Sequence, residues 1–146
     1  MRAATIDRVY EKEFQVDPKD LKSVALFSSL RDDELRLVAQ QADEVDVREG
    51  KQLITEGKFA YEFFAIKNGT ADVSIDGNVV RTLGQGDFFG ELGLLVSERR
   101  TATVVATSPM DLVVLTAAQF HAIERQMPSV AAQIRAAIEE RNQPVG

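Results

Sequence analysis

An acidic residue and an arginine nine residues apart are the side chains of this sequence best suited to bind an anion that also carries hydroxyl groups. Glu91 follows a glycine-rich approach over residues 84–90, and Arg100 opens the alternating run 101–104. A helix start flanked by glycines exposes backbone N–H groups, and these suit a phosphate. A carboxylate accepts hydrogen bonds from hydroxyls, while a guanidinium can donate two parallel bonds to two phosphate oxygens. The segment therefore predicts a phosphate-binding loop.

The composition excludes several other kinds of site. The chain has 146 residues, no cysteine and a single histidine, His121. Disulfides, thiolate metal sites and cysteine nucleophiles are therefore excluded, and so are β-barrel metalloenzymes that need several histidines. No nucleophile–base pairing stands out either. We expect neither an enzyme nor a metal centre, and we interpret His121 as a structural or surface residue.

The acidic charge and the lack of long apolar runs limit which partners and which cellular location we expect for the protein. The net charge is −6, which disfavours binding to nucleic acid because that needs a basic patch. A small anion remains compatible with this surface, since one arginine and a few backbone amides set the local field. Residues 1–8 carry charge before any apolar segment, and no apolar run approaches the length of a membrane span. We expect a cytoplasmic protein that binds no DNA and, by itself, no membrane.

Helical patterns lie at both ends of the chain. Residues 1–20 predict a helical or partly ordered extension, and residues 31–42 predict a helix with acidic residues at its positive end. Near the other end, Thr116 and the glutamine three residues later form a capping-box signature before an apolar helical face. Pro128 ends that helix, and a last helix is expected over 129–142.

The middle of the chain has the period of β-strands. Residues 44–48 and 70–76 alternate, and Asp76-Gly77 offers a two-residue hairpin turn before a strand over 79–83. Further strands fit 101–107 and 111–115. Short strands between glycines indicate an antiparallel sandwich or barrel. The order is helices, a small β-barrel and helices again, in one domain, with the phenylalanines of its middle expected in the core: Phe59, Phe63, Phe64.

Residues 89–94 and 100–104 together resemble the phosphate-binding cassette of cyclic-nucleotide-binding domains. That pattern runs Phe-Gly-Glu-Leu-Ala/Gly-Leu, then a variable loop, then Arg-x-Ala-Thr-Val. The resemblance covers about 21–142, which implies an extension over 1–20 and a nucleotide-binding domain over 21–146. It also implies a mainly β fold with flanking helices, a double-stranded β-helix (jelly-roll) barrel with N-terminal helices and two C-terminal helices.

The resemblance assigns roles to individual residues. Glu91 would hold the ribose 2′-hydroxyl and Arg100 the cyclic phosphate, while Leu92 would pack against the ligand. The backbone N–H groups of Gly93 and Thr101 would add to the phosphate site. The last helix often caps the base in this family, which makes Ile134 and Arg135 candidates for that contact. The ligand-binding residues implied in this way are Phe89, Gly90, Glu91, Leu92, Gly93, Arg100, Thr101 and Ala102.

Two positions depart from the family pattern or refine it. Arg99 stands where the family most often has proline, which creates a choice between adjacent arginines; the nine-residue spacing from Glu91 selects Arg100. Thr101 carries a hydroxyl that is associated in the family with contact to the guanine amino group, yet threonine or serine there also accompanies cAMP in bacterial members. The ligand is therefore expected to be cAMP or cGMP, with cAMP favoured on family frequency, and no other cofactor is implied.

The function implied is a regulatory sensor that binds the nucleotide and signals through movement of its C-terminal helices. Its output would need a protein partner or self-association. Only residues 142–146 follow the last expected helix, so we expect no DNA-reading unit. Two alternatives stay open: Glu91 and Arg100 pair only with each other, or the fold serves as an interaction module that needs no ligand.

Overall fold

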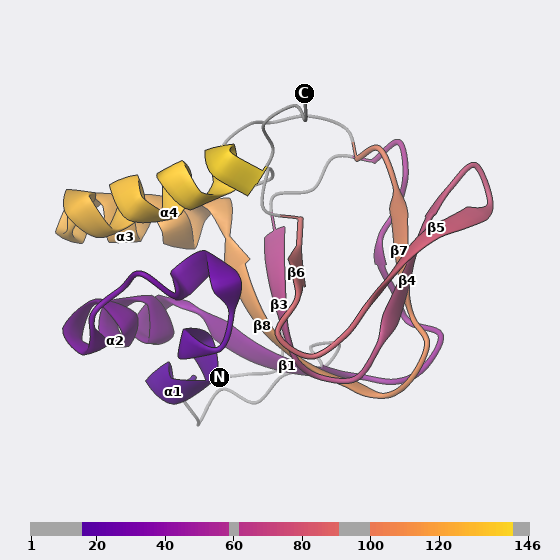
Figure 1. Cartoon of the computed structure of the whole chain (residues 1–146), viewed down its shortest axis with the longest axis horizontal. Coiled ribbons are helices and arrows are strands. Elements are labelled where there is room, and N and C mark those ends of the chain that lie inside the picture. Colours follow the sequence, from indigo (N-terminus) through magenta and orange to yellow (C-terminus); the bar gives the residue numbers. More distant parts are fainter. Residues whose placement is uncertain (1–15, 59–61, 91–99, 142–146) are drawn as a thin grey trace, which may run out of the picture.

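Two antiparallel sheets face each other, and a layer of helices covers the outer face of one of them (Figure 1). The computed structural model describes residues 16–58, 62–90 and 100–141. The mainly β class with flanking helices is confirmed. Closure into a barrel is not: within the described ranges the strands form two separate sheets of four strands each.

The helices begin and end close to the residues expected from the sequence. Thr116 caps its helix with the predicted box, because its Oγ1 accepts from the Gln119 backbone N–H at 3.1 Å and Gln119 Oε1 accepts from the Thr116 N–H at 2.8 Å. Pro128 not only ends that helix but opens the next, a position that proline favours. No helix in the described part of the chain has the length and apolar character of a bilayer span. The helices are α1 (Pro18–Lys22), the 3-10 turn η2 (Ala25–Phe27), α2 (Asp32–Gln41), α3 (Ala117–Gln126) and α4 (Pro128–Arg141).

Apart from the hairpin β4–β5, consecutive strands of the chain belong to different sheets. The hairpin turn predicted at Asp76-Gly77 is present: both residues have left-handed φ angles, 52° and 82°, as a type I′ turn requires. The first sheet contains, in spatial order, β1 (Asp43–Val47), β8 (Met110–Thr116), β3 (Glu62–Asn68) and β6 (Phe88–Phe89). The second contains β2 (Gln52–Ile54), β7 (Thr103–Ala106), β4 (Ala71–Ile75) and β5 (Asn78–Leu83).

The first sheet contributes to two apolar cores at once. Successive side chains of a strand point to opposite faces, so Phe63 packs with the helices while Phe64 packs between the sheets. Phe88 and Phe89 on β6 divide in the same way. Phe63 and Phe64 are 0% and 6% exposed, which confirms that both are core residues. Phe59 lies outside the described residues.

A buried carboxylate joins the N-terminal helices to α4. Glu34 on α2 is 2% exposed, and its Oε1 accepts from the Arg31 backbone N–H at 2.8 Å. Its Oε2 accepts from Gln133 Nε2 on α4 at 3.2 Å, and Gln133 Oε1 in turn accepts from the Ser29 hydroxyl at 3.3 Å. A buried charge is tolerated when its lone pairs are used in this way. Glu34 thereby fixes the position of α4 over α2.

Replacing Glu34 with alanine is expected to lower the free energy of unfolding by about 1–3 kcal/mol, because the donors of Arg31 and Gln133 would lose a buried acceptor. Chemical denaturation measures the change. Gln40→Ala, at an exposed position of the same helix, is the matched control and should change stability little. Equal effects of the two substitutions would contradict the structural role assigned to Glu34.

Two carboxylates lie directly opposite each other on β1 and β8. Asp46 pairs in register with Asp111, and Asp111 also accepts from Asn68 Nδ2 at 3.1 Å. The hydrogen bond with Asp111, together with burial, raises the pKa of Asp46 to about 6. The same hydrogen bond, followed by that of Asn68, lowers the pKa of Asp111. The pair therefore holds one proton that is lost as the pH rises through about 6.

This raised pKa makes stability depend on pH. A carboxyl whose pKa is raised by folding stabilises the fold fully below its unfolded pKa, roughly 4, and loses that contribution as the pH passes about 6. Asp46→Asn keeps a donor to Asp111 without a second charge, so it should stabilise the protein by about 0.5–1 kcal/mol at pH 7. The gain should vanish below pH 4. Thermal unfolding at both pH values, with exposed Glu49→Gln as control, measures it; a gain that is independent of pH would refute the shared proton.

Candidate functional site

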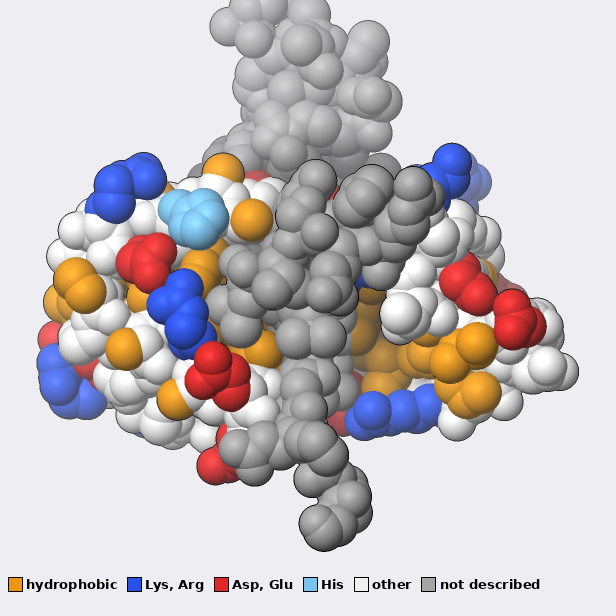
Figure 2. Space-filling view, turned by 90° about the horizontal axis from the view of Figure 1, so that it is seen from above, with side chains coloured by type: hydrophobic (Ala, Val, Ile, Leu, Met, Phe, Trp, Pro, Cys, Tyr) orange, Lys and Arg blue, Asp and Glu red, His pale blue; other side chains and the backbone are white. Residues whose placement is uncertain are grey.

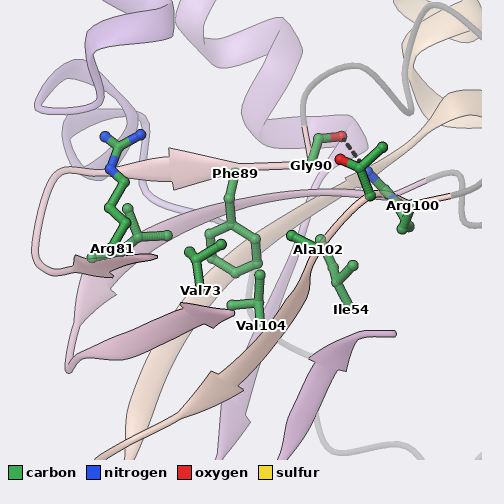
Figure 3. Close-up of a pocket in the computed structure, with 10 residues that line it drawn as sticks. Ile54, Val73, Arg81, Phe89, Gly90, Arg100, Ala102 and Val104 are labelled. Atoms are coloured by element: carbon green, nitrogen blue, oxygen red, sulfur yellow. Dashed lines mark hydrogen bonds between the residues drawn. The ribbon is translucent and has the colours of Figure 1, made fainter. Parts of the chain in front are cut away.

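A cavity of about 310 Å³ is lined by the second sheet together with β6 and the residues that precede β7. This volume lies at the lower end of the range of small-molecule sites, roughly 300–1,000 Å³. Figure 3 shows an apolar middle with one arginine at each end, Arg81 and Arg100. The lining residues are Ile54, Val73, Arg81, Leu83, Phe89, Gly90, Arg100, Thr101, Ala102 and Val104.

Arg100 is fixed by its backbone and by its side chain. Its N–H donates to the Lys58 carbonyl at 2.8 Å, and its carbonyl accepts from the Gly57 N–H at 2.8 Å. Its guanidinium donates from Nη2 to the Glu62 carbonyl at 2.7 Å and from Nη1 to the Gly90 carbonyl at 3.3 Å. The half-buried cation is therefore oriented before any ligand arrives. A preorganised guanidinium of this kind suits a phosphate.

Glycine is the only residue type that fits at position 90, between β6 and Arg100. Its φ of +78° lies in the left-handed region. A Cβ at this position would stand 2.7 Å from the Glu62 carbonyl oxygen and 3.3 Å from Arg100 Nη1. Glycine thus allows the backbone to pass close enough to present its own carbonyl to the arginine.

The middle of the cavity is apolar and partly aromatic. Phe89 is 6% exposed and stacks on Phe64, with ring centroids 4.9 Å apart and an interplanar angle of 13°. Val73 and Val104 project from β4 and β7 toward Phe89 (Figure 3). An apolar slot between two charged ends fits a ligand that has an anionic group and a flat ring.

Arg81 is a lining residue that the sequence interpretation missed. It lies opposite Val73 in the β4–β5 register and so shares the face that Val73 turns to the cavity. A signal was available in the sequence, because Arg81 is two residues from Leu83 and alternation places both on the same face. A cation on an otherwise apolar face marks a position that faces a ligand or solvent rather than a core.

The structure brings together those predicted ligand-binding residues that it describes. Five of the eight belong to the described ranges, and all five line this cavity: Phe89, Gly90, Arg100, Thr101 and Ala102. The other three lie outside the described residues, as does Arg99: Glu91, Leu92 and Gly93. The roles of all eight in binding stay predictions.

The two residues predicted to cap the base lie elsewhere. Ile134 is 0% exposed within the helical core. Arg135 donates from Nη1 to Glu124 Oε2 at 3.0 Å, and its guanidinium carbon lies 5.4 Å from the centre of the Phe120 ring. Neither residue lines the cavity. A capping role stays a prediction that requires α4 to move.

The acidic and histidine side chains in the described part of the chain do not form a metal site. Within those ranges no three of them come together in a way that could hold a metal ion. His121 is exposed and lies 3.4 Å from Glu124 Oε1 through its Nδ1. The cavity is therefore the feature that carries the functional interpretation.

Known proteins share both the sequence pattern and the fold. The model of the cyclic nucleotide-binding domain family matches residues 44–126. A cGMP-dependent protein kinase of Eimeria tenella is 38% identical over 88 residues, which are 60% of this chain and 9% of that protein. A cAMP-dependent protein kinase regulatory subunit of Yarrowia lipolytica is 37% identical over 84 residues, 58% of this chain and 22% of that protein.

A solved structure agrees with these relatives. The regulatory domain of Toxoplasma gondii PKA, crystallised with cAMP, is 35% identical and superposes with a TM-score of 0.66 over 73% of this chain and 42% of that one. The chain spans less than a quarter of the two kinase-related proteins, so the match concerns one domain of each. The jelly-roll fold and the resemblance seen in the sequence are thereby confirmed: the chain belongs to the cyclic nucleotide-binding domain family.

Proposed function

We propose that the cavity binds a purine cyclic nucleotide and that the chain acts as the sensor module of a signalling system. The observation that carries the proposal is the fixed guanidinium of Arg100 at one end of an apolar cavity. An anionic phosphate gains most from a donor that is already oriented, because no side-chain order is lost on binding.

In this proposal the cyclic phosphate lies against Arg100 and the backbone N–H of Thr101. Glu91 accepts from the ribose 2′-hydroxyl, as the family pattern implies. The purine enters the slot beside Val73 and Phe89, with its edge toward Arg81. Support comes from the matched charges: the ligand has its anion at one end and its polar ring edge at the other.

The preference between adenine and guanine depends on Arg81, at the end of the cavity opposite Arg100. Arg81 can only donate, and guanine presents two acceptors, N7 and O6, where adenine presents one acceptor and one donor. Family frequency favours cAMP, while one named relative is described as cGMP-dependent and the other as cAMP-dependent. We therefore propose that the cavity accepts both cAMP and cGMP, and that Arg81 contributes preferentially to the binding of cGMP.

The output of binding belongs to the same proposal. A ligand shifts a conformational equilibrium only when it contacts one state better than the other. We infer that α4 provides the second state and that a partner protein, or a second copy of the chain, detects it. The relative from Yarrowia lipolytica supports this reasoning, because it is a regulatory subunit of a kinase.

Arg100→Ala is expected to weaken the binding of both nucleotides by at least about 100-fold. Two charge-assisted hydrogen bonds, roughly 1.5–3 kcal/mol each, would be lost. Isothermal titration calorimetry with cAMP and cGMP measures the two Kd values. Arg100→Lys should restore only part of the affinity, because an ammonium group cannot donate two parallel hydrogen bonds as a guanidinium does. Arg48→Ala removes the same charge at an exposed turn and serves as control. A wild-type protein that binds neither nucleotide would favour the ligand-independent interaction module instead.

Arg81→Ala is expected to raise the Kd for cGMP by about 5-fold or more and to change the Kd for cAMP less. The loss lies at the low end of what a two-bond contact to guanine provides, because Arg81 is exposed to solvent. The same calorimetry, with Arg48→Ala again as control, gives the ratio of the two Kd values. An equal loss for both nucleotides would assign Arg81 to general electrostatic attraction rather than to selectivity.

A further inference from the structure

The turn that follows β2, residues 55–58, holds the main chain of Arg100 in place. The Lys58 N–H closes this turn by donating to the Thr55 carbonyl at 3.1 Å. The Arg100 N–H donates to the Lys58 carbonyl, and the Arg100 carbonyl accepts from the Gly57 N–H, each at 2.8 Å. The turn therefore supports the Arg100 end of the cavity, although none of its four residues is among those that line it.

Glu56 extends this support to the β4–β5 hairpin. Its backbone N–H donates to Thr103 Oγ1 at 3.0 Å, at the start of β7. Its side-chain Oε1 accepts from the backbone N–H of Asp76 at 3.2 Å, and Asp76 is the first residue of the hairpin turn. Glu56 thus contacts both β7 and the tip of the hairpin whose strands contribute Val73 and Arg81 to the cavity.

The tip of this hairpin extends past the neighbouring strand (Figure 1). Among the described residues, β7 pairs with β4 as far as Ser74, and β5 is an edge strand of the second sheet. Figure 2 shows hydrophobic side chains at the surface on the β-sheet side of the molecule, and the hairpin exposes three of this kind: Ile75, Val79 and Val80. Exposed segments with few buried contacts open readily. The hydrogen bond from Asp76 to Glu56 therefore limits where the tip can lie.

A β-bulge separates the tip from Arg81. Val73 lies opposite Arg81 in the β4–β5 register. The next residue of β4, Ser74, lies opposite Val79, so Val80 is the extra residue of β5. A bulge interrupts the ladder of hydrogen bonds and bends its strand. The tip can therefore pivot about Val80, and Arg81 is the residue next to that pivot.

We propose that Glu56 is a positioning residue of the nucleotide site, which holds the hairpin so that Arg81 faces the edge of the purine. The inference rests on the proposed function and deepens it, because it names the residue through which the Arg81 end of the cavity depends on the Arg100 end. Glu56 contacts no ligand in this proposal. It acts by reducing the conformational freedom that the hairpin would otherwise lose when the nucleotide binds.

The contribution of Glu56 should depend on the base. A loosened hairpin withdraws Arg81, which contributes preferentially to the binding of cGMP. The phosphate end keeps its support, because the backbone hydrogen bonds of Arg100 do not involve the side chain of Glu56. Glutamine retains a carbonyl oxygen that can accept from the Asp76 N–H. Glu56→Gln should therefore preserve the position of the hairpin, whereas Glu56→Ala should not.

The test uses the whole chain and compares the wild type with Glu56→Ala, Glu56→Gln, Arg81→Ala and the double variant that combines Glu56→Ala with Arg81→Ala. Glu49→Ala removes a carboxylate from the exposed turn between β1 and β2 and serves as control. Isothermal titration calorimetry gives the Kd values for cAMP and cGMP. Hydrogen exchange of the ligand-free proteins gives the protection of residues 75–80.

Glu56→Ala should raise the Kd for cGMP about 3-fold, raise the Kd for cAMP less, and speed hydrogen exchange in the hairpin. The expected change is small because the hydrogen bond to Asp76 is exposed to solvent. Glu56→Gln and Glu49→Ala should both match the wild type. When Arg81 is already alanine, Glu56→Ala should leave the ratio of the two Kd values unchanged, because the group that Glu56 positions is gone.

The outcomes separate the positioning role from the proposed function. Nucleotide binding by the wild type tests the function, and the comparison of Glu56→Ala with Glu56→Gln tests the role of Glu56. Unchanged binding of cGMP by Glu56→Ala, or an equal loss for both nucleotides, would overturn the role and leave the function intact. A loss as large in Glu56→Gln, or a changed ratio that persists in the double variant, would overturn it too. A wild type that binds neither nucleotide would overturn both.

Discussion

The rest of the site depends on one contact: the guanidinium of Arg100 donates hydrogen bonds to two backbone carbonyls, those of Glu62 and Gly90. Glu62 begins β3 and Gly90 follows β6, so both carbonyls belong to the first sheet, whereas Arg100 precedes β7 of the second. The three-way contact therefore joins the two sheets beside the cavity, which Gly90 and Arg100 both line. It also explains why glycine is needed at position 90, since any side chain there would push the carbonyl of Glu62 away.

The first sheet transmits this constraint to the helices because it is buried on both faces. Neighbouring residues on one strand, Phe63 and Phe64, belong to different cores, and Phe88 and Phe89 repeat the division on β6. Phe89 lines the cavity while Phe88 packs under the helices. Close-packed interiors shift between discrete arrangements rather than deform continuously. A displacement of β6 by a ligand would therefore be felt in the helical layer without any intervening loop.

Burial of the first sheet on both faces explains why some strands could be predicted from the sequence and the strand β3 could not. Residues 70–83 and 111–115 alternate or follow a turn signal, and the structure has strands there. The central strand β3 was not predicted, because Phe63 to Ile66 form a continuous apolar run without a period of two. Arg81 was missed because Val79 and Val80 place an apolar residue on each face of β5, so the alternation does not single out one face. The contact of Arg135 with α3 was unpredictable in principle, since local patterns carry no information on which helix lies nearby.

The energetics of α4 limit how it can move. Burying a side chain such as Val130, Ile134 or Ile138 contributes roughly 1.5–3 kcal/mol, so the stripe as a whole holds the helix more strongly than a typical coupling free energy of about 1–3 kcal/mol can overcome. A ligand therefore cannot unpack the stripe. A motion of α4 that serves the proposed function would therefore keep the stripe buried and exchange only the polar partners beside it. The proposed signalling through α4 would then depend on the polar contacts that flank the stripe, which run from Gln133 to Glu34 and from Arg135 to Glu124.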